Sequence, residues 1–358
     1  MAVALSLVVF EVKEWVDALC ANALLYSEPS TVMVLHLNAA VNYSSATIVQ
    51  WNSSNPRVGV GAHRVPVQWG RGGILYAHLI NAEHAVARWP HVRYFVLQAS
   101  NMMWHRPGWE AVVHRLRWSV QEDVAQVGMH NSLQQLARRH PFYQNLSSSS
   151  DHVRQATHYA EGSFYPIDTV VRFASYLRDW VRRATSSGNC RLWQGDKTAP
   201  CAESHPRSWY HVRHGSLVGT FNSSASTFGS SYQLDEILFT FPFPEEYWLP
   251  AYAMNVERLR PHPAPVAASP ARGRQLCYRH DLHAKLVPLE LVETMQTNMS
   301  FRMVGSECAG EPSNRFFAVK RVLWRDTHDQ HFANALNQPL VQRLLRCDAQ
   351  QRICNPEV

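Results

Sequence analysis

Residues 4–37 read A-L-S-L-V-V-F-E-V-K-E-W-V-D-A-L-C-A-N-A-L-L-Y-S-E-P-S-T-V-M-V-L-H-L, and this stretch decides the fold. Its first part, Ala4–Phe10, is an apolar run that predicts a buried strand. Val12–Tyr26 carries an apolar stripe and predicts a helix, and Thr31–Leu37 predicts a second strand. A strand, a helix and a strand in succession are typical of a parallel βαβ unit.

The same alternation continues as far as residue 98. A polar loop that carries glycosylation sequons is followed by a short strand at Arg57–Gly61, a helix from about Gly73 to Trp89 and a strand at Tyr94–Gln98. We therefore expect an α/β protein with a mostly parallel, Rossmann-like central sheet flanked by helices. Ligands bind such sheets beyond the carboxyl ends of the strands. The polar residues expected at those ends are His36, Asn38, His63, Arg64 and Gln98 to Asn101.

Later segments alternate less regularly. Helices are expected at Glu110–Gln126 and Ile167–Arg183, and residues 145–150 form a Ser-rich exposed loop. Residues 261–274, P-H-P-A-P-V-A-A-S-P-A-R-G-R, predict a flexible loop rather than a domain boundary. At 358 residues the chain could form one large α/β domain or two ordinary ones, and we expect a single domain over residues 1–358.

The composition fits a folded protein with an anionic partner. A hydrophobic content of 46% is ample for a core, and 17% charged residues excludes a disordered chain. The net charge of +6 suits a sugar nucleotide or an acidic glycan. It would suit nucleic acid equally well, but the Lys and Arg residues are scattered and form no basic stripe, so no nucleic acid partner is expected.

The first apolar run, Ala2–Phe10, does not predict a membrane span. It is too short to cross a bilayer, and Glu11 and Lys13 end it. It also lacks the basic start and the small-residue cleavage site of a signal peptide. Attachment to a membrane is expected only through an anchor outside this chain.

The cysteines and sequons bear on the compartment. The seven cysteines contain no C-x-x-C pair, which argues against a zinc ribbon or a thioredoxin-like site. Cys190 with Cys201, and Cys347 with Cys354, each bracket a short loop compatible with a disulfide, and Cys20 is expected to be buried and free. The alternative is a set of buried thiols in a reducing compartment. Five N-x-S sequons favour an oxidising lumen, at Asn42, Asn52, Asn145, Asn222 and Asn298.

Six motifs resemble those of one family of glycosyltransferases, in the same order. They are V-L-H-L-N at 34–38, V-P-V-Q-W-G-R-G-G-I-L-Y-A-H at 65–78, Y-F-V-L-Q-A-S-N at 94–101, E-G-S-F-Y-P-I-D-T-V at 161–170, P-E-E-Y-W-L-P-A at 244–251 and H-F-A-N-A at 331–335. Together they resemble the core-2/I-branching β-1,6-N-acetylglucosaminyltransferases, which have the peptide xylosyltransferases as relatives.

The resemblance covers nearly the whole chain and implies a GT-A-like fold. Residues 1–110 would then form the nucleotide-binding half, and residues 151–345 the half that binds the acceptor and carries the catalytic base. The donor would be a UDP-sugar, and the acceptor a glycan or glycoprotein. The implied location is the Golgi lumen or another secretory compartment, with the cytoplasm as the alternative.

The chain departs from the family at positions that bear on its substrate. Asn38 stands where the family usually has an aspartate, and Ser100 and Asn101 stand where it has G-x-D. Ala335 replaces a lysine that in relatives helps to neutralise the nucleotide diphosphate.

The catalytic base is expected in F-P-F-P-E-E-Y-W-L-P-A, residues 241–251. Glu245 and Glu246 adjoin aromatic residues there, and desolvation would raise the pKa of a carboxylate towards the range of a general base. The alternative is a helix start with acids in its first turn. The resemblance implies Glu246 as the base and Glu245 as its neighbouring acid. It further implies that Tyr247, Trp248 and Glu161 face the donor sugar or acceptor, and that His36, Trp69 and Gly70 line the nucleotide pocket.

The charge on the leaving diphosphate is expected to be met by cationic side chains. N-R-F-F-A-V-K-R-V-L-W-R, residues 314–325, predicts a half-buried strand that offers Lys320, Arg321 and Arg325. No acid follows the strand Tyr94–Gln98, where a cation would need hard oxygen ligands, so we expect no metal and no other cofactor. The sequence thus predicts an inverting, metal-independent glycosyltransferase. The alternatives are a non-catalytic glycan-binding protein of the same fold and a basic nucleic-acid-binding protein.

Overall fold

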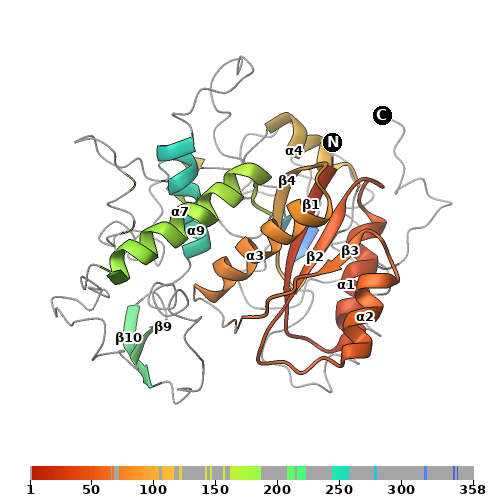
Figure 1. Ribbon diagram of the computed structural model, residues 1–358. Coiled ribbons are helices and arrows are strands. Elements are labelled where there is room, and N and C mark those ends of the chain that lie inside the picture. The colour runs from red at the N-terminus through yellow and green to blue at the C-terminus, as the bar shows by residue number, and fades with distance from the viewer. Residues whose placement is uncertain are drawn as a thin grey trace.

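The computed structural model has an α/β fold built on one mixed, mostly parallel sheet with flanking helices (Figure 1). It describes residues 2–65, 67, 72–104, 107–116, 121–122, 142, 146, 156–157, 162–186, 208–213, 216–222, 244–257, 278–279, 318–320, 342 and 345. Within these ranges the side chains of 115–116, 121–122, 156–157, 181–186, 208–213, 216–222, 244–246, 278–279 and 318–320 are not described.

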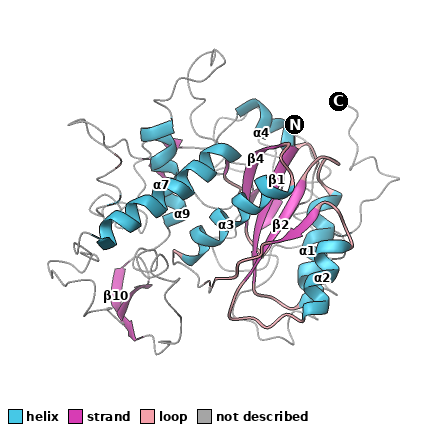
Figure 2. Ribbon diagram, viewed as in Figure 1, coloured by secondary structure: helices cyan, strands magenta, loops and turns pink. Residues whose placement is uncertain are grey.

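The elements follow one another along the chain in two groups. The first group is β1 (Ala2–Val9), α1 (Lys13–Leu25), β2 (Val32–Leu37), α2 (Ser45–Ser53), β3 (Val58–Val60), α3 (Gly73–Arg88), β4 (Val92–Gln98), β5 (Met102–Trp104) and α4 (Trp109–Leu116). The second group is β6 (Gln121–Glu122), β7 (Ala156–Thr157), β8 (Phe164–Pro166), α7 (Ile167–Ser186), β9 (Ser208–Arg213), β10 (Ser216–Asn222), α9 (Pro244–Tyr252), the π-helical turn η2 (Ala253–Glu257), β11 (Tyr278–Arg279) and β12 (Ala318–Lys320). Figure 2 shows helices α1 and α2 on one side of strands β1 and β2 and helix α3 on the other. None of the helices in the described part of the chain has the length and apolar composition that crossing a bilayer requires.

The main sheet has the strand order β3-β2-β1-β4-β8. Strands β1 to β4 run parallel, and β8 runs antiparallel to β4. The chain moves outward from β1 to β2 and β3, then crosses back to place β4 on the other side of β1. This reversal between β1 and β4 is the topological switch point at which doubly wound sheets bind their ligands. The expectation of a mostly parallel α/β sheet is therefore confirmed.

The central strand β1 separates two layers of the core. All of its residues are buried, as expected for a parallel strand covered by helices on both faces. Val3, Leu5, Leu7 and Val9 point to the face that α1 and α2 cover, because successive side chains of a strand alternate. Ala2 and Ala4 point to the opposite face, which α3 and α7 cover.

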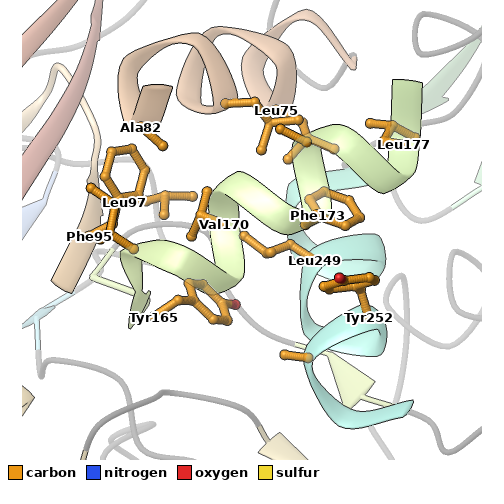
Figure 3. Packing of buried hydrophobic residues seen from close by; sticks show 14 of the residues in the cluster. Leu75, Ala82, Phe95, Leu97, Tyr165, Val170, Phe173, Leu177, Leu249 and Tyr252 are labelled. Carbon is orange, nitrogen blue, oxygen red and sulfur yellow. The ribbon is translucent and has the colours of Figure 1, made fainter. Parts of the chain in front are cut away.

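The second face of the sheet joins the two halves of the chain. Figure 3 shows side chains of α3, α7 and α9 converging on residues of β4 and β8, for example Leu75, Phe173 and Leu249 around Leu97 and Tyr165. Strand β8 enters this layer at Gly162, whose φ of 76° lies in the left-handed region that suits glycine. Residues of both halves therefore contribute to one core.

A smaller sheet adjoins the end of β4. It has the order β11-β12-β5, with β12 antiparallel to β5. Because β5 begins only four residues after β4 ends, this sheet is attached to the carboxyl end of β4.

Two expectations from the sequence are corrected. The sequon-bearing segment after β2 contains helix α2, which the sequence analysis treated as loop; the Ser44 hydroxyl caps it by accepting from the backbone N–H of Thr47 at 3.1 Å. The helix expected at Glu110–Gln126 ends as α4 at Leu116, and Gln121–Glu122 instead forms strand β6 against β7. Strand pairing overrides helix propensity there.

Gly59 in β3 is required by a close approach of α3. A Cβ at this position would lie 2.8 Å from Cη2 of Trp89 and 3.0 Å from Nε2 of His84. The Trp89 ring cannot move easily, because it packs edge-to-face on His84 and under the Arg88 guanidinium.

Gly59→Ala should therefore lower the free energy of unfolding by about 1–3 kcal/mol, because the added methyl overpacks this contact. Urea denaturation measures the loss. Gly61→Ala is the matched control, since its Cβ would meet nothing closer than 3.4 Å. Equal stability of the two variants would contradict this packing.

Glu110, in the first turn of α4, binds the turn between α1 and β2. This turn lies at the amino edge of the sheet, the edge at which the parallel strands begin. Its carboxylate accepts from the backbone N–H of Glu28 at 2.7 Å and from the Thr31 hydroxyl at 2.9 Å. Arg57 grips the same turn by donating to the carbonyl oxygens of Glu28 and Thr31. Burial raises the pKa of Glu110 from 4.5 to about 7, although these hydrogen bonds oppose the rise.

Because its pKa is raised, the contribution of Glu110 to the free energy of unfolding depends on pH. The folded state binds the proton more tightly than the unfolded state, so the stabilisation is complete below pH 4.5 and is lost as pH rises through about 7. Relative to Glu110→Gln, which stays neutral, the wild type should lose roughly 3 kcal/mol of unfolding free energy between pH 4.5 and 8. A difference in unfolding free energy between wild type and Glu110→Gln that does not change with pH would contradict the prediction.

Candidate functional site at the carboxyl edge of the sheet

The candidate site is the edge at which β1, β2, β3 and β4 end, hereafter the carboxyl edge. Three loops meet there, because the backbone N–H of Asn38 donates to the carbonyl of Val9 at 2.9 Å and that of Ala39 donates to Val65 at 3.0 Å. The structure therefore brings together the predicted residues that follow β2 and β3.

Asn38 clamps the loop that follows β3. Its Nδ2 donates to the carbonyl of Val67 at 2.9 Å, and its Oδ1 accepts from the N–H of Val67 at 3.0 Å and of Ala40 at 3.1 Å. Arg64 returns from that loop and donates to the carbonyl oxygens of Asn38 and Val41. The two loops are thus fastened to each other by side chains of both.

Both polar atoms of the Asn38 amide, Nδ2 and Oδ1, make hydrogen bonds. An aspartate, the usual residue of the resembled family, could accept from Val67 but could not donate to its carbonyl while ionised. Asn38 therefore positions a loop in this structure, and its described contacts are to backbone.

His36, in β2, also binds the loop that follows β3. It is fully buried, and its Nε2 lies 3.1 Å from the N–H of Val65 and 3.4 Å from the Val65 carbonyl. The closer N–H makes Nε2 the acceptor, so the neutral ring carries its proton on Nδ1. Burial lowers the pKa of His36 to about 4, with nearby Arg64 adding to this effect. Within the described residues, Nδ1 has no hydrogen-bond partner.

Ser100 and Asn101 form the turn between β4 and β5 and are each 5% exposed. The carbonyl of Ser100 accepts from Nε1 of Trp15 at 3.0 Å, which holds the turn against α1. Oδ1 of Asn101 is buried and has no partner among the residues that the structure describes. Asn101 thus keeps an acceptor available at the switch point beside β1.

The sequence analysis overlooked Glu11, which directly follows β1. This buried carboxylate accepts from the N–H of Phe10 at 2.9 Å, and its carbonyl accepts from the Tyr43 hydroxyl at 2.5 Å. Burial raises the pKa of Tyr43, and the Glu11 carboxylate raises it further. The sequence signal was an acid at the end of a buried strand, which was interpreted only as the end of an apolar run.

The register of the small sheet brings the backbone of Lys320 to the strand that follows the turn at Ser100 and Asn101. Lys320, the last residue of β12, pairs with Met102, the first residue of β5. The Lys320 side chain, Arg321 and Arg325 lie outside what the structure describes.

The acidic pair Glu245 and Glu246 occupies the first turn of α9, which begins at Pro244. The helix start weighed in the sequence analysis is therefore correct for the backbone, while both carboxylates lie outside the described side chains. A carboxylate in a first turn is favoured by the helix macrodipole, which opposes any rise of its pKa.

Tyr247 and Trp248 are corrected from expected sugar contacts to core residues. Their exposed fractions are 1% and 0%, and the Trp248 ring stacks on Phe142 with centroids 4.6 Å apart. Both rings belong to the buried cluster that also contains Phe173 and Leu177 of α7, so neither ring is accessible to a sugar.

The end of the α9–η2 segment is anchored by Glu257, which the sequence analysis also missed. The carboxylate is 1% exposed and accepts from Arg172 at 2.6 Å, which raises the pKa of the guanidinium, and from the Tyr252 hydroxyl at 3.0 Å. A buried carboxylate needs such partners, and an acid within a largely apolar segment is the signal that could have identified it.

Other predicted residues are placed in part or not at all. Cys20 is buried and free, as expected, and Asn42 is exposed. Asn52 uses its Oδ1 to accept from Val60 and Arg88. Only the backbone of Asn222 is described, at the end of β10. Trp69, Gly70, Glu161, Cys190, Cys201, Cys347, Cys354, Asn145, Asn298 and the loop 261–274 lie outside the described residues.

No group of three or more His, Cys, Asp or Glu side chains that could hold a metal occurs among the described residues. No family model matches the chain, and the search of curated proteins returned no match.

Asn38→Asp should lower the free energy of unfolding by about 1–3 kcal/mol, because a buried donor is lost and a carboxylate faces the carbonyl of Val67. Urea denaturation at neutral pH measures this, and acid should recover part of it as the carboxyl becomes a donor. Asn55→Asp is the control, since the described bond of its side chain is an Oδ1 acceptor contact with the N–H of Arg57. Equal stability of the two variants would refute the two-sided clamp.

Proposed function

We propose that the protein is an inverting, metal-independent glycosyltransferase with a GT-A-like fold, which binds a UDP-sugar at the carboxyl edge. The strand order supports this, because its switch point between β1 and β4 is where doubly wound sheets bind nucleotides. By the resemblance of its motifs, the donor sugar is N-acetylglucosamine and the acceptor is a hydroxyl of a glycan or glycoprotein.

The pairing of Lys320 with Met102 is the observation that carries the proposal. It brings the backbone of Lys320, more than 200 positions away in sequence, beside the strand that follows β4, at the edge where the sheet would hold a diphosphate. In the mechanism, Lys320, Arg321 and Arg325 stabilise the charge that develops on UDP as the glycosidic bond breaks.

Glu246 acts as the general base. It takes the proton of the acceptor hydroxyl as that oxygen attacks the anomeric carbon, and the bond from this carbon to the diphosphate oxygen breaks on the opposite side. The products are the inverted glycoside and UDP, and the proton remains on Glu246. Glu245 lies one residue earlier in the same helical turn and serves as the neighbouring acid.

His36 and Asn38 have an indirect part in this mechanism. Their described contacts hold residues 65 and 67, and the chain continues from there to Trp69 and Gly70, which would line the nucleotide pocket. The compartment we propose is the Golgi lumen or another secretory compartment.

Glu246→Gln should reduce turnover by about 10²–10⁴ and leave UDP affinity nearly unchanged, because only the proton acceptor is removed. Glu245→Gln is the matched control and should lose much less. Full turnover in Glu246→Gln would remove this base from the mechanism.

Calorimetric titration with UDP separates the enzyme from the alternatives. UDP should bind equally with EDTA and with added Mn²⁺, and EDTA should leave turnover intact. Activity that is lost in EDTA and restored by Mn²⁺ would contradict the metal-independent mechanism. Binding of glycans without UDP or turnover would favour a glycan-binding protein, and salt-sensitive binding of nucleic acid without UDP binding would favour the third class.

A further inference from the structure

Asn22 is a fully buried amide in the last turn of α1. Its Nδ2 donates to the carbonyl of Trp104 at 2.8 Å, and its Oδ1 accepts from the N–H of Trp104 at 2.7 Å. A flipped amide would set donor against donor and acceptor against acceptor, so the orientation is determined by both bonds. Asparagine is a poor residue within a helix, which makes these contacts the physical reason for its position.

These bonds complete the inner edge of β5. Successive residues of a strand direct their backbone groups to opposite edges. Trp104 is paired by Asn22 on the edge towards α1, and the carbonyl of Met102 accepts from Nε2 of Gln98 on the same side at 3.3 Å. Met103, between them, therefore directs its N–H and C=O to the outer edge, where Val319 of β12 is its register partner.

The position of the small sheet β11-β12-β5 depends on how β5 is held along its inner edge. Strand β12 has three residues and β11 has two, too few for independent stability in water. The described hydrogen bonds that hold β5 and the turn before it are the Asn22 pair, the Gln98 bonds, the bond from the N–H of Met102 to the carbonyl of Ala99 at 3.2 Å and the bond from Trp15 to the carbonyl of Ser100. Among them, the Asn22 pair is the one in which a single side chain binds both backbone groups of a β5 residue.

We propose that Asn22 is a positioning residue for β12, and through β12 for Lys320. Asn22 acts by replacing a neighbouring strand on the inner edge of β5, which sets the place at which β12 adds to the outer edge. The anion that Lys320 would meet is the diphosphate of UDP, and this part of the inference rests on the proposed function.

Hydrogen exchange of Asn22→Leu tests the positioning without any ligand. The substitution leaves both backbone groups of Trp104 unpaired, so protection of the amides in 102–104 and 318–320 should fall about tenfold or more, while β1 and β2 stay protected. Gly59→Ala is the control for lost stability, and it should leave 318–320 protected relative to global unfolding. Unchanged protection of 318–320 in Asn22→Leu would overturn the proposal.

The affinity for UDP tests the consequence. Asn22→Leu should weaken UDP binding about tenfold or more, with a shallower dependence on salt because cationic contacts are lost. Gly59→Ala should bind as the wild type does. If Asn22→Leu selectively loses protection at residues 318–320 but binds UDP as tightly as the wild type, the proposed link between the position of β12 and UDP binding is wrong. If wild type binds no UDP, the proposed function fails, and hydrogen exchange still decides whether Asn22 positions β12.

Asn22→Asp provides the second variant if Asn22→Leu does not fold. It keeps the acceptor for the N–H of Trp104 and loses the donor to its carbonyl, so both readouts should change in the same direction as in Asn22→Leu. Wild-type behaviour of Asn22→Asp in both measurements would count against the two-sided pairing.

Discussion

The structure depends on the pairing of β1 with β2 on one side and with β4 on the other. Both pairings are parallel, so the loops after all three strands emerge at one edge. The burial of every β1 residue prevents a shift of register, because a shift by one residue would exchange the side chains of the two core layers. Everything that we assign to the carboxyl edge, from Glu11 to Asn101, follows from this arrangement.

The carboxyl edge is held mainly by side chains bound to backbone. Asn38 holds Val67, His36 holds Val65, Trp15 holds Ser100 and Asn22 holds Trp104. Such contacts fix the loops to one another and to the ends of the strands. Burial shifts two pKa values in opposite directions at the two edges: it lowers the pKa of His36 to about 4 at the carboxyl edge and raises the pKa of Glu110 to about 7 at the amino edge.

The sequence predicted the strands and helices of the first half because each is an uninterrupted apolar run or stripe. It did not reveal α2, whose one buried residue is Trp51 and whose clearest signal is the Ser44 cap. Tyr247 and Trp248 were misassigned because an aromatic residue that packs in a core looks the same in sequence as one that stacks on a sugar. The pairing of Lys320 with Met102 is a contact between distant segments, which local periodicity does not encode. In the sequence, Asn22 is only a polar residue within an apolar stripe. Its hydrogen bonds to Trp104 could not be inferred without knowing where β5 lies.

The central claim is that the carboxyl edge binds the nucleotide, and hydrogen exchange with and without UDP tests it most directly. The claim predicts that UDP slows exchange in residues 61–67 and 99–104, and leaves the turn at 26–31, on the amino edge, unchanged. Protection of the turn at 26–31 without protection of the other two segments, or no change anywhere at saturating UDP, would contradict it.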